Sequence, residues 1–300
     1  STDGTLVYAR GSSAPANSRT LAWIDRQGRE SALTAPPRPY IYARVSPDGG
    51  RIVTYVPDQD AELWVWDIAR ATLTRLTFAP NQDLHPIWAS DSRRVFFSSE
   101  RDGQRNLYTQ AADGTGAADR LTTSANQQNA TGLTPDGTRL LFYENSAQTS
   151  GDILQVEVPG THTVTPLLQT PATERNGIVS PDGRWLAYEA DDTGVLEVYV
   201  RPYPDVGRGR WQVSTSGGTR PLWAPDGREL FYVSSTNALM RVGVEPSVSW
   251  TATTPKMLLK EGTVLIPGGN LGRTYDIAPD GQRFVVIKEP SGPEVAPPQL

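Results

Sequence analysis

The chain has 300 residues, of which 37% are hydrophobic and 20% charged, as in an ordinary globular protein. Its 28 Lys and Arg against 33 Asp and Glu give a net charge of −5, so we expect no nucleic-acid partner. No apolar stretch approaches the roughly 20 residues that cross a bilayer, and we expect no membrane insertion. The absence of cysteine excludes disulfides, thiolate nucleophiles and Cys-based zinc sites.

A short turn motif recurs along the whole chain, with 45, 43, 45, 46, 44 and 54 residues between successive copies. In its full form it reads small residue, Pro, Asp, Gly. Full copies begin at Ser46, Thr134, Ser180, Ala224 and Ala278, and degenerate copies begin at Ser1 and Ala89. Pro presets the first corner of a type I turn, Asp can bond the backbone two residues on, and Gly accepts a left-handed φ. Each copy therefore predicts a β-hairpin turn.

Alternating segments rich in β-branched and aromatic residues follow the turns, which is typical of buried strands. In chain order these segments are 51–55, 95–97, 140–143, 185–188, 229–232 and 283–287. Second strands are expected at 63–66, 106–108, 153–156 and 198–200, and short third strands at 73–76 and 165–168. With the strand before each turn, every unit is a four-stranded antiparallel sheet. Such units at a period in the forties predict a β-propeller.

The two ends of the chain are expected to close the ring. Five complete blades fit between about Tyr40 and Lys260. The remaining expected strands are 5–10, 20–25 and 29–33 at the N-terminus, and 274–277 and 283–288 at the C-terminus. Joined, they make a sixth blade and remove the free edges, although one strand is left over. The sequence predicts an all-β, six-bladed propeller in one domain over residues 1–290, with a Pro-rich tail at 291–300. Seven blades is the alternative.

Several short runs combine the turn motif with distinctive strand ends. They are LAWIDRQG at 21–28, RVSPDG at 44–49, LTRLT at 73–77, PIW at 86–88, EVYVRP at 197–202, PLW at 221–223 and YDIAPDGQRF at 275–284. Together they resemble the TolB-like, WD-repeat-like propeller repeats, and are most similar to the sensor modules that follow the kinase domain in bacterial serine/threonine protein kinases. The resemblance covers nearly the whole chain and implies an extracytoplasmic location. The chain itself has no kinase signature.

Candidate site residues follow from the position of the innermost strands, which line the central channel of a propeller. Alternation along each strand puts the residues four and six positions before the motif on one face. This places Tyr42, Asp83, His85, Glu174, Asn176 and Arg220 around one channel mouth, and we expect Arg175, Arg273 and Asp276 beside them. Because they carry both charge signs and converge, we expect a binding site there.

His85 has three interpretations. It bonds a neighbouring loop, it shares a divalent cation with Asp83, Glu174 and Asn176, or it contacts a ligand without taking part in chemistry. In the second case Ca, Zn or Mn activates a water, and His85 and Glu174 are the catalytic residues. No other cofactor is implied, and no nucleophile-elbow, zincin, P-loop or dinucleotide fingerprint is present.

The remaining candidates are assigned to ligand binding, and they are Tyr42, Arg175, Arg220 and Arg273. The arginines either bind a carboxylate or phosphate, or simply pair with Glu174 and Asp276. The first expected function is a monomeric binding or sensing propeller that recognises a small molecule or a protein. The alternative is a metal-dependent hydrolase of an ester, lactone or phosphotriester. A scaffold with Trp and Tyr on an outer face is a third.

Overall fold

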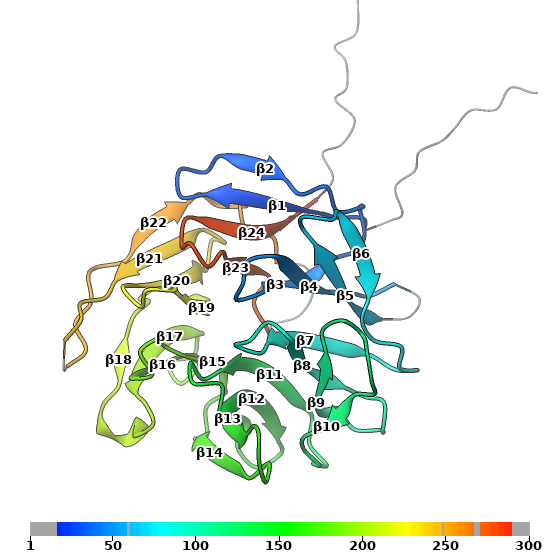
Figure 1. Ribbon diagram of the computed structural model, residues 1–300. Coiled ribbons are helices and arrows are strands. Elements are labelled where there is room, and N and C mark those ends of the chain that lie inside the picture. Colours follow the sequence, from blue (N-terminus) through cyan, green and yellow to red (C-terminus); the bar gives the residue numbers. More distant parts are fainter. Residues whose placement is uncertain (1–16, 59–60, 248, 267–270, 290–300) are drawn as a thin grey trace, which may run out of the picture.

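The computed structural model describes residues 17–58, 61–247, 249–266 and 271–289, and in them six four-stranded sheets surround a central axis (Figure 1). This confirms the predicted all-β, six-bladed propeller over the seven-bladed alternative. Helix is limited in these residues to the 3-10 turn η1 (Val206–Arg208), and no helix there has the length and apolarity needed to cross a bilayer. The predicted strand 5–10 and the tail 291–300 lie outside the described residues.

Five blades each use four strands that are consecutive in the chain, with the first strand innermost (Figure 1). Blade 1 holds β3 (Ile41–Val45), β4 (Arg51–Val56), β5 (Glu62–Asp67) and β6 (Thr72–Arg75). Blade 2 holds β7 (Asp83–Trp88), β8 (Arg94–Ser99), β9 (Asn106–Ala111) and β10 (Asp119–Arg120). Blade 3 holds β11 (Gln128–Leu133), β12 (Arg139–Ser146), β13 (Ser150–Glu157) and β14 (Val164–Leu168). Blade 4 holds β15 (Glu174–Val179), β16 (Trp185–Ala190), β17 (Glu197–Pro202) and β18 (Trp211–Gln212), and blade 5 holds β19 (Gly218–Trp223), β20 (Glu229–Ser234), β21 (Leu239–Gly243) and β22 (Lys256–Leu259).

Blade 6 joins the two ends of the chain, as predicted. Its strands lie in the order β2 (Glu30–Ala32), β1 (Thr20–Asp25), β24 (Arg283–Lys288) and β23 (Tyr275–Ile277). β1 pairs antiparallel with β24 along its whole length, and Figure 1 shows the blue and red strands side by side. Two N-terminal and two C-terminal strands therefore complete the ring, so the described part of the blade needs no fifth strand.

The hydrophobic core is divided into six clusters, each between two adjacent blades. Between blades 5 and 6, for example, Phe231 and Phe284 meet edge to face with their ring centroids 5.1 Å apart. Both faces of a blade pack against neighbours, which is why its central strands are buried along almost their whole length. Each blade thus depends on the two beside it.

The recurring turns have the predicted chemistry. In the first full copy Ser46 Oγ donates to Asp48 Oδ1 at 2.5 Å, and Gly49 has a φ of +72°. Thr134 and Asp136 repeat the first contact at 2.6 Å. These hydroxyl bonds hold the pKa values of Asp48 and Asp136 below their usual range. The turn aspartates therefore stabilise hairpins that bring equivalent residues of each blade to one face of the ring.

Candidate functional site

The innermost strand of five blades contains a β-bulge, where the pairing register shifts by one residue. In four blades a left-handed residue marks the bulge: Tyr42, His85, Asn176 and Arg220 have φ values of 58, 54, 53 and 57°. The uninterrupted alternation expected from the sequence is therefore wrong at this position. The sequence does contain a sign of these bulges, because Pro86, Gly177 and Pro221 directly follow three of the left-handed residues. Proline inside a sheet is confined to edges and bulges, since it donates no N–H.

The segment that leads into β23 lies against the bulge residues of three blades. The backbone N–H of Gly272 donates to Asn176 Oδ1 at 2.8 Å. A Cβ on Gly272 would come within 2.9 Å of both His85 Nδ1 and Tyr42 Cε1. Gly272 also has a φ of +77°, in the left-handed region. Both this backbone conformation and the close approach to His85 and Tyr42 therefore require glycine. The rings of Tyr42 and His85 pack with centroids 4.5 Å apart and both residues are buried, so we call the group around Gly272 the filled part of the channel.

Glu189, on β16, organises the channel wall between blades 4 and 5. Its carboxylate is fully buried and accepts hydrogen bonds from Arg175 Nε at 2.8 Å and Asn176 Nδ2 at 2.6 Å. The backbone N–H of Arg220 also donates to it. Arg175 is therefore ion-paired, as one interpretation expected, but with Glu189 and not with Glu174. Glu189 lies on the second strand of its blade, where the sequence offers no sign of this role.

The two acidic residues predicted to bind a metal lie in separate networks. Asp83 is buried and pairs with Arg101, whose Nη2 is 2.8 Å from Asp83 Oδ2. Glu174 accepts hydrogen bonds from the hydroxyl and the backbone N–H of Thr170. Burial raises the pKa of both carboxyl groups, which favours their neutral forms. Both residues anchor local chain segments beside the innermost strands.

His85 and Asn176 meet around Gly272, but without the two acids. Both ends of the Asn176 amide are occupied, one by Glu189 and the other by Gly272. Within the described ranges, no three His, Asp or Glu side chains form a group that could hold a metal ion. The four residues as arranged therefore do not fit such an ion.

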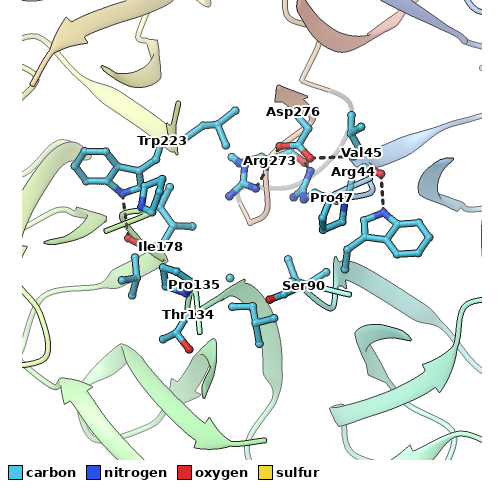
Figure 2. Close-up of a pocket in the computed structure, with 17 residues that line it drawn as sticks. Arg44, Val45, Pro47, Ser90, Thr134, Pro135, Ile178, Trp223, Arg273 and Asp276 are labelled. Carbon is cyan, nitrogen blue, oxygen red and sulfur yellow. Dashed lines mark hydrogen bonds and ion pairs between the residues drawn. The ribbon is translucent and has the colours of Figure 1, made fainter. Parts of the chain in front are cut away.

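An open cavity of about 440 Å³ lies at the end of the channel that faces the recurring turns (Figure 2). We call it the turn-side cavity. Every blade contributes the residue two positions before its motif: Arg44, Ile87, Gly132, Ile178, Leu222 and Asp276. Trp88 and Trp223 add to the walls, and their indole N–H groups donate to the carbonyls of Arg44 and Ile178 at 3.0 and 3.4 Å. The cavity is of the size that holds a small ligand, and its aromatic walls are fixed in place.

One side of the turn-side cavity is charged. Figure 2 shows Arg44, Arg273 and Asp276 together, across the cavity from Ser90 and Pro135. Arg44 Nη1 donates to the carbonyl of Arg273 at 2.7 Å, which links blade 1 to blade 6. Arg273 Nη2 is 3.7 Å from Asp276 Oδ1. Burial, with the nearby charge of Arg273, lowers the pKa of Arg44 to about 9, so Arg44 is still a cation at neutral pH.

The structure separates the four residues predicted to bind ligand. Arg273 lines the turn-side cavity, whereas Tyr42 and Arg175 belong to the filled part of the channel. Arg220 lines a second depression, of about 630 Å³, together with Glu197 between blades 4 and 5. Arg44 was missed from the sequence. The sequence could have indicated it by comparison of the blades. Four blades have Gly, Ile or Leu two positions before the motif, whereas blades 1 and 6 have the charged residues Arg44 and Asp276 there.

Comparison with known proteins assigns the chain to a family. The family described as "TolB beta propeller domain" matches residues 26–177, just over half of the chain. The chain belongs to the TolB β-propeller family. An uncharacterized protein of Agrobacterium fabrum is 25% identical to it over 199 residues, which are 63% of this chain and 67% of that protein.

Two solved structures show the same fold at low sequence identity. A TolB-like protein from Agrobacterium tumefaciens has a TM-score of 0.70 at 16% identity, covering 90% of this chain and 98% of its own. Oligogalacturonate lyase in complex with manganese has a TM-score of 0.59 at 18% identity, covering 88% and 76%. TolB-family propellers and an enzyme thus share one architecture, and the function of this chain must be argued from its own site.

In this TolB-family propeller, His85→Asn is expected to flatten the pH dependence of stability below pH 6.5. Burial, with the charges of Arg105 and Arg44, lowers the pKa of His85 from 6.5 to about 3. Between these values the unfolded chain binds a proton that the folded chain does not, so stability falls as the pH falls. The wild type should lose about 2 kcal/mol through His85 between neutral pH and pH 5. Urea unfolding at the two pH values measures this loss.

His162→Asn is the matched control, because His162 is the other histidine of the chain and also has a φ of 54°. It is partly exposed, so its replacement should leave the pH dependence of the wild type intact. If His85→Asn keeps the wild-type dependence as well, His85 is not held neutral by the fold.

Proposed function

We propose that this chain is a binding or sensing module that recognises a small molecule or a protein segment in the turn-side cavity. The observation that carries the proposal is the convergence of all six blades on one open cavity. Its walls combine fixed tryptophans and aliphatic side chains with the charged group of Arg44, Arg273 and Asp276. An apolar cavity with a few convergent polar groups is the usual form of a ligand site.

The setting of this module is also a proposal. We place it outside the cytoplasm, as a sensor like the propellers that follow bacterial kinase domains. Its support is membership of the TolB family and the runs at 44–49 and 275–284. We further propose a monomer with a single domain over 1–290 and a tail at 291–300, because the chain pairs its own two ends in blade 6.

The metal-dependent hydrolase stays a prediction from the sequence. The likeness to oligogalacturonate lyase concerns the fold, at 18% identity. Asp83 and Glu174 are engaged with Arg101 and Thr170, away from the group around His85. The contacts of these residues therefore favour the binding function over the hydrolase.

A blocking substitution tests the proposed site. A panel of short linear peptides and small aromatic and aliphatic molecules is screened by the melting temperature of the protein. A ligand at 100 times its Kd should stabilise the wild type by about 2.7 kcal/mol. Ser90 is exposed at the rim of the cavity, so Ser90→Trp should remove the shift. Ser31 is exposed on β2, and Ser31→Trp should keep it. A shift that survives Ser90→Trp places the binding site elsewhere.

A further inference from the structure

The positive and negative charges on the charged side of the turn-side cavity do not cancel. Arg44, Arg273 and Asp276 are only 4, 9 and 8% exposed. Arg273 and Asp276 form one long ion pair at 3.7 Å, and among the described residues Arg44 is in no ion pair. Two guanidinium cations therefore share a single carboxylate, which leaves one positive charge largely removed from water. A buried charge of this kind is unfavourable until an anion compensates it.

The hydrogen bonding of the two arginines is incomplete in the same place. Arg44 Nη1 donates to the carbonyls of Ala43 and Arg273 at 2.9 and 2.7 Å, which fixes its guanidinium. The Nε atoms of Arg44 and Arg273 are buried and have no hydrogen-bond partner within the described part of the chain. A guanidinium group carries five N–H donors in a rigid plane, and this plane matches the two oxygens of a carboxylate. The site is therefore prepared to receive a planar anion.

The remaining walls determine what the anion is attached to. Ile87, Ile178 and Leu222 occupy the positions that Arg44 and Asp276 occupy in blades 1 and 6. No other charged side chain lines the cavity in the described ranges. One negative charge neutralises the site, whereas a doubly charged phosphate would add an excess charge beside Asp276. Apolar walls with one net cation thus favour an apolar body with a single negative charge.

We infer that the ligand of the turn-side cavity carries one carboxylate on an apolar body, either as a small organic acid or as the free end of a peptide. The inference rests on the proposed function and adds the ligand class to it. The carboxylate would lie at Arg44 and Arg273, and the apolar body would contact Ile87, Ile178 and Leu222. Asp276 sets the charge balance of the site.

The test uses two probes, 4-phenylbutyrate for a small acid and N-acetyl-leucyl-leucine for a peptide end, each as the acid and as the primary amide. Titration calorimetry on the whole chain should show at least one acid binding ten times or more tightly than its amide. Arg273→Gln should remove this preference. Asp276→Asn should raise the affinity for the acid severalfold, because it removes the competing charge while its carbonyl can still accept the N–H of Val45. Arg29 is 79% exposed just before β2, the outermost strand of blade 6, and Arg29→Gln should change nothing.

Three results would overturn the inference: equal affinity of acid and amide for both probes, no binding of either form, or a weaker acid affinity in Asp276→Asn than in the wild type. If circular dichroism shows that Arg273→Gln does not fold, the test is decided by two other quantities. These are the ratio of acid to amide affinity in the wild type and the acid affinity of Asp276→Asn. Ser90→Trp distinguishes failure of the carboxylate inference from failure of the proposed function. Equal binding of acid and amide that Ser90→Trp abolishes leaves the proposed function standing without the carboxylate, whereas binding that persists in Ser90→Trp removes the proposed site itself.

Discussion

Glu189→Gln is expected to lower the free energy of unfolding by about 3–5 kcal/mol, because it removes one partner of a buried ion pair. Glu189 is fully buried and is bonded to Arg175, to the side chain of Asn176 and to the backbone of Arg220. The neutral amide leaves the Arg175 guanidinium without its anion in a site closed to water. Urea unfolding at pH 7 measures the loss.

Glu30→Gln is the control for this change. Glu30 pairs with Lys288 at 2.9 Å, but its side chain is 46% exposed, so the same substitution should cost less than about 1 kcal/mol. The two variants differ in the burial of the lost charge, so the difference between their losses of unfolding free energy measures the effect of burial. A cost for Glu189→Gln as small as that for Glu30→Gln would mean that the network does not hold the channel together.

The same network connects the filled part of the channel to the proposed binding site. Glu189 holds Asn176, Asn176 accepts the N–H of Gly272, and Arg273 follows directly in the chain. The position of Arg273 in the turn-side cavity therefore depends on a carboxylate in another blade. We expect Glu189→Gln to weaken ligand binding in this cavity as well as stability, since a displaced Arg273 no longer faces Arg44.

The fold could be predicted from the sequence because its determinants are local. Pro, Asp and Gly at the turn at Ser46 specify a hairpin by themselves, and their recurrence at a period in the forties predicts the blades of a propeller. Blade 6 was predictable for the same reason, since the turn at Ala278 leaves β23 and β24 in need of partners. The bulges were within reach too, through Pro86 and Pro221, but a two-residue alternation ignores them.

The site was less accessible because its residues meet only through the closed ring. Arg44 and Arg273 are 229 residues apart, and their contact depends on blade 6 lying beside blade 1. Glu189 is one of many acidic residues in the sequence, and its role arises from three partners on two other strands. Charge and alternation placed Asp83 and Glu174 near His85, whereas Arg101 and Thr170 bind these carboxylates locally.

Phe284→Ala is expected to lower the free energy of unfolding by about 3–5 kcal/mol, because it opens a cavity where the ring closes. Phe284 lies on β24, is completely buried, and pairs with Ile24 of the N-terminal strand and with Ile277. Its ring also packs edge to face on Phe231 of blade 5. One side chain thus joins both ends of the chain to the neighbouring blade.

Phe78→Ala makes the same change at a residue that is 70% exposed, and it should alter stability by no more than about 0.5 kcal/mol. Urea unfolding of both variants gives the comparison, and ligand titration of Phe284→Ala extends it to function. Closure through blade 6 brings Arg273 and Asp276 beside Arg44, so a loosened closure should weaken carboxylate binding along with stability. If Phe284→Ala were as stable as Phe78→Ala, the pairing of the two chain ends would not be what holds the ring closed. The turn-side cavity would then lose its structural basis.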